Sequence, residues 1–171
     1  MIGNHRPTTV EVAVAGPAEV AESPVWDDDS GELAWVDIPA GLIRRWRPGT
    51  DVVSTLAVGQ PVGAIALQRG GGLVAAVRDG FAIVDEAIGT TTPCALIEAD
   101  RPNIRMNDGK CDRAGRFWAG TMAEDMRPGA GSLYRLDPDL TVTTILTGVS
   151  VSNGIGWSPD DRTMYYVDSV E

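Results

Sequence analysis

The chain has 171 residues, 43% hydrophobic and 22% charged, a globular composition that argues against disorder, collagen and coiled coil. Its net charge of −10 repels phosphate backbones and so argues against nucleic-acid binding. No apolar run approaches the roughly 18 residues of a membrane span, and the N-terminus lacks the apolar core of a secretory signal. We therefore expect a cytoplasmic protein without nucleic-acid or membrane partners.

Short apolar stretches bounded by Gly, Pro and Asp follow one another along the chain, a pattern typical of strands and turns. In chain order they include GELAWVDIPA, GLIRRWRPGT, GGLVAAVRDG, FAIVDEA, GRFWAGTM, GSLYRLDP, TVTTILTG and RTMYYVDS. They are rich in Val, Ile, Thr and aromatic residues, which favour strands. The sequence therefore predicts an all-β fold.

A turn followed by a buried strand recurs four times. The first apolar residues after these turns are Leu33, Leu73, Phe117 and Met164, at intervals of 40, 44 and 47 residues. About four short strands in each interval is typical of one blade of a β-propeller. A β-sandwich with coincidental spacing is the alternative. The sequence predicts three blades and part of a fourth, which leaves an open edge.

His5 is the only histidine, and it lies in the polar first segment. A Ser-His-Asp or Cys-His site would depend on that segment, and neither a zinc HExxH motif nor a P-loop is present. Enzymatic chemistry would therefore have to come from carboxylates, amides, arginine or a metal.

Three polar side chains precede the repeated strands at nearly equal distances. Glu22, Asn107 and Asn153 lie 11, 10 and 11 residues before the aligned apolar positions. Equivalent positions of successive blades lie at one end of the channel, where such oxygen atoms suit a divalent cation. The second blade, near residues 61–63, has no such ligand. The alternatives are hairpin turns at Asn107–Gly109 and Asn153–Gly154, and an exposed loop carboxylate at Glu22.

The segments ESPVWDDDSGELAWVDIPAGLIRRW, IRMNDGKCDRAGRFWAGTMAED and SNGIGWSPDDRTMYYVDS resemble the SMP-30/gluconolactonase/regucalcin-like family. The resemblance spans about residues 20–171. It implies a six-bladed β-propeller with one divalent metal on its axis, and hydrolysis of sugar lactones. The chain would be a single domain over 1–171, the N-terminal part of an incomplete propeller, with residues 1–19 as an arm.

The resemblance also implies roles for five residues. Glu22 and Asn153 would be metal ligands, and Arg105, Asn107 and Asp125 would contact the substrate. Asp125 stands where relatives of this kind have the longer Glu. The third ligand, an Asp that is also the expected general base, would lie about 50 residues beyond the S-N-G motif, past Glu171.

We therefore expect a metal-dependent lactonase that is incomplete and inactive as this chain. The cation would be Ca²⁺, Zn²⁺, Mg²⁺ or Mn²⁺, and the small-molecule partner a sugar lactone. The alternative function is a non-catalytic calcium-binding propeller module. A truncated chain and a genuine short protein are the two alternatives for its length. The expected protein partner is a second copy of the chain, bound through the open propeller edge.

Overall fold

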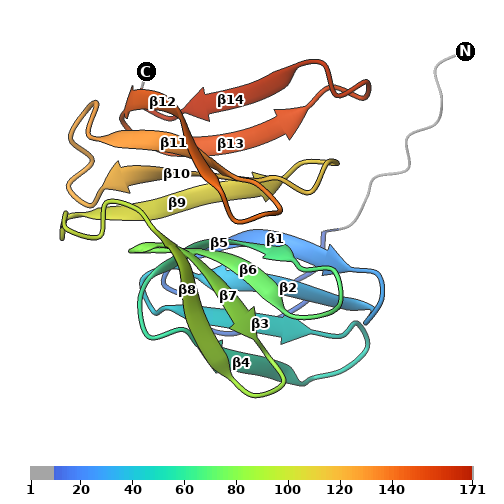
Figure 1. Cartoon of the computed structure of the whole chain (residues 1–171). Coiled ribbons are helices and arrows are strands. Elements are labelled where there is room, and N and C mark those ends of the chain that lie inside the picture. Colours follow the sequence, from blue (N-terminus) through green and yellow to red (C-terminus); the bar gives the residue numbers. More distant parts are fainter. Residues whose placement is uncertain (1–9, 171) are drawn as a thin grey trace, which may run out of the picture.

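The computed structural model describes residues 10–170. The expected arm over residues 1–19 is therefore described only from residue 10, and His5 lies outside the described range. No helix within residues 10–170 is long and apolar enough to cross a membrane. The described chain consists of antiparallel strands and turns, which confirms the predicted all-β class (Figure 1).

The strands form four consecutive antiparallel sheets, which we call blades 1 to 4. Blade 1 contains β1 (Ala21–Asp27), β2 (Glu32–Asp37), β3 (Leu42–Trp46) and β4 (Val53–Ala57). Blade 2 contains β5 (Val62–Leu67), β6 (Leu73–Val77), β7 (Gly80–Asp85) and β8 (Thr90–Leu96). Blade 3 contains β9 (Ile104–Cys111), β10 (Phe117–Ala123), β11 (Gly131–Leu136) and β12 (Val142–Val149). Blade 4 has the two strands β13 (Ser152–Trp157) and β14 (Met164–Asp168).

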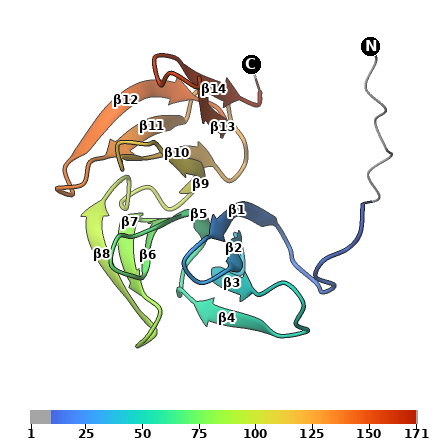
Figure 2. The same cartoon turned by 90° about the vertical axis from the view of Figure 1, so that its right-hand side faces the viewer.

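The blades are arranged around a common axis. Strands β1, β5, β9 and β13 lie innermost, and β4, β8 and β12 lie outermost (Figure 2). Each of the four aligned apolar residues lies at the beginning of the second strand of its blade, Leu33 in β2, Leu73 in β6, Phe117 in β10 and Met164 in β14. The sequence repeat is therefore the blade repeat, and the expected incomplete propeller is confirmed.

The core lies between consecutive blades, so blades 2 and 3 bury both faces. Strand β5 shows this directly: Ile65 packs in the cluster shared with blade 1, and the adjacent Ala64 packs in the cluster shared with blade 3. Alternating side chains of one strand thus belong to two different cores. Trp118, Leu133 and Ile155 form the smaller core between blades 3 and 4. Every residue of β10 is buried, whereas most of the outer strand β12 is exposed.

Glycine permits strands of neighbouring blades to approach one another closely near the axis. A Cβ atom placed on Gly63 of β5 would lie 2.1 Å from the backbone oxygen of Asn107 on β9. One placed on Gly120 of β10 would lie 2.0 Å from Oγ of Ser152 on β13. Neither distance is compatible with a side chain, so these glycines set the spacing of blades 2, 3 and 4 near the axis.

At the opposite end of blade 3, Asp112 organises the turn between β9 and β10. Its carboxylate accepts hydrogen bonds from the backbone N–H groups of Ala114 and Arg116, both at 3.0 Å. It also accepts from Nε of Arg116 at 2.7 Å and Nε1 of Trp118 at 2.9 Å. Burial alone would raise the pKa of Asp112, but these donors hold that pKa below its usual 3.8.

Replacement of Gly63 by alanine should destabilise the fold by about 1–3 kcal/mol, because the new methyl group meets a backbone oxygen that cannot move without shifting β9. Urea unfolding of Gly63→Ala measures the loss. Gly156→Ala is the matched control, because a Cβ atom there meets no heavy atom within 4 Å. Equal stability of the two variants would contradict the close approach.

The lowered pKa of Asp112 predicts a pH effect with a defined sign. A carboxylate whose folded pKa is depressed stabilises the fold above its unfolded pKa, and this contribution disappears as the pH falls through the folded value. Free energies of unfolding should therefore decrease between about pH 5 and pH 3 in the wild type. The decrease should be smaller in Asp112→Asn, and parallel pH curves for the two proteins would refute the prediction.

Candidate metal and substrate site in the channel

All four inner strands carry a pairing irregularity near the same end. In β1 the register shifts between Glu22 and Val25, and in β5 between Val62 and Ala64. In β9 the shift falls at Asn107 and Asp108, opposite Gly120 of β10. In β13 it lies between Asn153 and Ile155. A β-bulge turns side chains out of the regular alternation, so these shifts redirect the residues beside them.

The hairpin-turn interpretation of Asn107 and Asn153 and the loop interpretation of Glu22 are therefore wrong. Asn107 and Asn153 are not in hairpin turns, because they lie within β9 and β13. Glu22 is exposed, but it lies in β1 and not in a loop. A short polar segment that begins with Asn and ends in Gly occurs in hairpin turns and in β-bulges alike. In this protein both such segments form bulges.

Glu22 is held in place by its neighbour Ser23. Ser23 has a φ of 51°, and its buried Oγ accepts a hydrogen bond from the backbone N–H of Ile65 on β5, at 3.2 Å. This bond joins the bulge of β1 to blade 2. Glu22 borders a cavity of about 640 Å³ that is also lined by Asp108, Lys110 and Gly154. The cavity therefore brings residues of β1, β9 and β13 to one space.

Asn153 has a fixed amide orientation in the structure. Its Nδ2 donates to Oγ of Ser169 at 3.1 Å, and its Oδ1 accepts from the backbone N–H of Gly154 at 3.1 Å. Gly154 has a φ of 53° and is the extra residue of the bulge. The amide oxygen retains a second lone pair, so Asn153 can still act as an oxygen ligand.

Arg105 and Asn107 form one unit. Nη1 of Arg105 donates to Oδ1 of Asn107 at 2.8 Å and to the backbone oxygen of Met106 at 3.0 Å. Nδ2 of Asn107 donates to the backbone oxygen of Ser152 on β13 at 2.8 Å. Asn107 therefore connects blade 3 to blade 4 and orients Arg105 at the same time.

The guanidinium of Arg105 is partly withdrawn from water. Burial lowers its pKa, and the negative charge of Glu124 opposes that change. Both of its hydrogen bonds use Nη1, so among the described residues Nε and Nη2 are left to bind a ligand. Arg105 can thus present a planar pair of donors to substrate oxygen atoms.

The structure does not bring Asp125 to Arg105 in the described residues. The side chain of Asp125 is 60% exposed and pairs with Arg127 at 3.1 Å. The acidic group whose negative charge acts on Arg105 is Glu124, the residue directly before Asp125. Glu124 was not among the predicted site residues, although it stands beside Asp125 in the T-M-A-E-D segment. Contact of Asp125 with substrate stays a prediction.

The predicted ligands lie at the same end of their strands, on blades 1 and 4. Within residues 10–170 no three His, Cys, Asp or Glu side chains gather as a metal site would require. The donor chemistry nevertheless fits a hard cation, because a carboxylate and an amide oxygen are the ligands that Ca²⁺ and Mg²⁺ prefer. Glu22 and Asn153 are thus compatible with part of a ligand set.

These features define part of a β-propeller with oxygen donors and an arginine at one end of its channel. The family model described as "SMP-30/Gluconolactonase/LRE-like region" matches residues 20–171. The chain belongs to this family, as the sequence motifs predicted. Regucalcin from Xenopus laevis is 40% identical over 166 residues, which cover 94% of this chain and 56% of that protein.

Solved structures agree with this assignment. A calcium-binding protein, regucalcin from Agrobacterium tumefaciens, superimposes with a TM-score of 0.86 at 31% identity, covering 91% of this chain and 52% of the other. A gluconolactonase from Xanthomonas campestris superimposes with a TM-score of 0.70 at 22% identity, covering 89% and 55%. The second likeness shows the fold alone. The chain spans about half the length of the relatives it matches.

Replacement of Asn107 by alanine should cost about 1–3 kcal/mol, because the backbone oxygen of Ser152 loses its donor and Arg105 loses its orienting acceptor. Urea unfolding measures this loss. Asn103→Ala is the matched control, since Asn103 is exposed and precedes the same strand. An equal effect of both substitutions would show that Asn107 does not connect the blades.

Proposed function

We propose that this chain forms part of a metal-dependent hydrolase of sugar lactones, in which Glu22 and Asn153 are two oxygen ligands of a divalent cation. The observation that carries the proposal is the set of bulges at one end of four adjacent inner strands. Two of these strands hold the predicted oxygen ligands, and β9 holds Arg105 two residues before its bulge. Membership of a family whose description includes gluconolactonase supports it.

The reaction is the addition of water to the lactone carbonyl carbon, followed by cleavage of the ring C–O bond to give a hydroxy acid. Glu22 and Asn153 would hold the divalent cation, which would supply Lewis-acid chemistry toward the lactone carbonyl and water. Because lactones are activated esters, no nucleophilic serine is needed. The expected general base lies beyond residue 171, so we assign no described residue to proton abstraction.

Arg105 binds and orients the substrate in this proposal. Its free Nε and Nη2 donors face ring hydroxyl or carbonyl oxygen atoms, where a guanidinium stabilises developing negative charge. Asn107 acts through Arg105, since its Oδ1 holds Nη1 at 2.8 Å. Glu124 adds a negative charge next to the guanidinium and favours its protonated form.

A non-catalytic calcium-binding module is the second candidate. The observation that favours it is the similarity to the regucalcin structure described as a calcium-binding protein. Such a module would bind the cation through the same two residues, and its thermal stability would increase with Ca²⁺. The absence of lactone turnover would separate it from the enzyme.

The test uses a longer protein that contains residues 1–171, together with the 171-residue chain. Aldonolactones are supplied with Ca²⁺, Zn²⁺, Mg²⁺ or Mn²⁺, and acid release is followed with a pH indicator. The longer protein should hydrolyse at least one lactone in a metal-dependent way. The 171-residue chain alone should not exceed the background rate, because the expected general base is absent from it.

Glu22→Gln in the longer protein should reduce kcat/KM by more than about 100-fold, because a carboxylate ligand is lost. Glu19→Gln is the matched control, since Glu19 is an exposed glutamate three residues earlier. A longer protein that turns over no lactone with any of the metals would refute the enzymatic proposal. Turnover by the 171-residue chain would show that the general base lies within it.

A further inference from the structure

One backbone hydrogen bond recurs at the channel end of every blade. The backbone N–H of the residue directly after the second strand donates to the backbone oxygen of the residue directly before the inner strand. The four bonds are Ile38 to Val20 at 3.0 Å, Arg78 to Pro61 at 2.8 Å, Glu124 to Asn103 at 2.9 Å and Ser169 to Val151 at 3.1 Å. They establish which positions of the four blades are equivalent, independently of the sequence spacing.

Carboxylates occur at the equivalent position in two blades. The residues immediately before the four donors are Asp37, Val77, Ala123 and Asp168. The residues two positions after the four acceptors are Glu22, Gly63, Arg105 and Asn153. The blades with an aspartate at the first position are therefore the blades with a predicted metal ligand at the second. Blades 2 and 3 have neither.

Asp37 binds the segment that leads into β1. Its Oδ1 accepts from the backbone N–H groups of Glu19 and Val20, both at 3.1 Å, and its Oδ2 lies 3.2 Å from the same Glu19 nitrogen. Asp37 is only 2% exposed, and Nη2 of Arg44 lies 3.5 Å from Oδ2. A buried carboxylate thus fixes the backbone two and three residues before Glu22.

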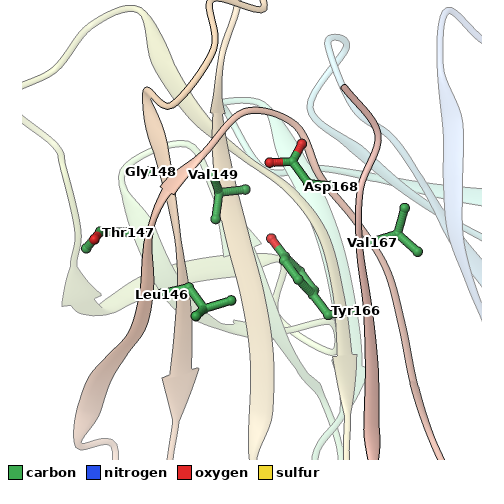
Figure 3. Close-up of a pocket in the computed structure, with 7 residues that line it drawn as sticks. All are labelled: Leu146, Thr147, Gly148, Val149, Tyr166, Val167 and Asp168. Carbon is green, nitrogen blue, oxygen red and sulfur yellow. The ribbon is translucent and has the colours of Figure 1, made fainter. Parts of the chain in front are cut away.

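Asp168 binds the segment that leads into β13 in the same way. Its Oδ2 accepts from the backbone N–H of Ser150 at 2.6 Å, and its Oδ1 from that of Val151 at 2.8 Å. Figure 3 shows Asp168 and Tyr166 on the side of β14 that faces Val149, whereas Val167 points away. The carboxylate therefore fixes the backbone two and three residues before Asn153, the same offsets as in blade 1.

In blade 2 the corresponding segment is bound through an uncharged side chain. The side chain of Gln60 accepts from the backbone N–H of Asp79 at 3.1 Å, so a neutral amide of the entry segment replaces the carboxylate of the second strand. Hydrogen bonds to an ionised acceptor are shorter and about twice as strong as neutral ones. The charged acceptor is thus found in the two blades that carry a predicted ligand, and its bonds are short in blade 4, at 2.6 and 2.8 Å.

We propose that Asp37 and Asp168 are positioning residues for the metal site, and that they fix Glu22 and Asn153 by binding the backbone amides two and three residues before each ligand. This inference rests on the proposed function. A metal ligand must be held to within about 0.5 Å of its productive position. Residues 10–20 form no strand, so without Asp37 the approach to β1 would depend on a single backbone bond.

The test measures cation binding by the longer protein that contains residues 1–171, with Mn²⁺ in isothermal titration calorimetry. Glu22→Gln should abolish binding. Asp37→Asn and Asp168→Asn should weaken it about tenfold or more, because an amide NH₂ group would face a backbone N–H. Amide hydrogen exchange at Val20 and Val151 should become faster in the respective variants, a change that does not require metal.

Asp112→Asn is the matched control. Asp112 also binds two backbone amides through its carboxylate, but at the other end of blade 3. This substitution should lower stability and leave the Mn²⁺ affinity unchanged. An equal loss of affinity in Asp112→Asn would overturn the inference, since the effect would then follow from global stability.

The two proposals fail in different ways. If the wild type binds Mn²⁺, Glu22→Gln does not, and both Asp37→Asn and Asp168→Asn bind like the wild type, then the metal site stands and the positioning role is wrong. If the wild type binds no Mn²⁺, or if Glu22→Gln binds as tightly as the wild type, the proposed ligand assignment is wrong and the positioning role falls with it.

Discussion

The close contact between strands of neighbouring blades near the axis is the constraint on which the rest of the structure depends. Gly63 lies against the backbone of Asn107, and Gly120 lies against Ser152, at distances that no side chain would allow. These contacts bring the channel ends of blades 2, 3 and 4 together. The hydrogen bond from Asn107 to Ser152 is possible only because the strands are this close. The polar contacts near the axis therefore depend on the close packing of the strands there.

The bulges and the aspartates act on different parts of the same strands. A bulge determines the direction of a side chain, because it breaks the alternation of the strand at Glu22, Asn107 or Asn153. Asp37 and Asp168 determine where the strand begins, because they bind the amides ahead of it. Arg105 needs neither aspartate, since Asn107 on its own strand orients it.

The blade repeat could be predicted because each second strand follows a turn rich in Gly and Asp, and these turns recur with the repeat. The channel-end position of Glu22, Asn107 and Asn153 followed from the same spacing. Their place in bulges could not be predicted, since Asn107–Gly109 has the composition of a hairpin turn. The effect of the Glu124 charge on Arg105 could not be predicted, because the direction of adjacent side chains where a strand ends depends on the fold. Asp37 and Asp168 bind residues 17 or 18 positions earlier, a relation that only the structure reveals.

Glu22 lies on blade 1 and Asn153 lies on blade 4, so the two predicted ligands belong to different sheets. In a repeat array the free energy of folding is approximately a sum over units and their interfaces. The apparent affinity of a ligand that needs both residues is reduced by the fraction of molecules in which both blades are ordered. Such a ligand is therefore thermodynamically linked to the folding of both blades, and its binding reports their order as well as the chemistry of the channel.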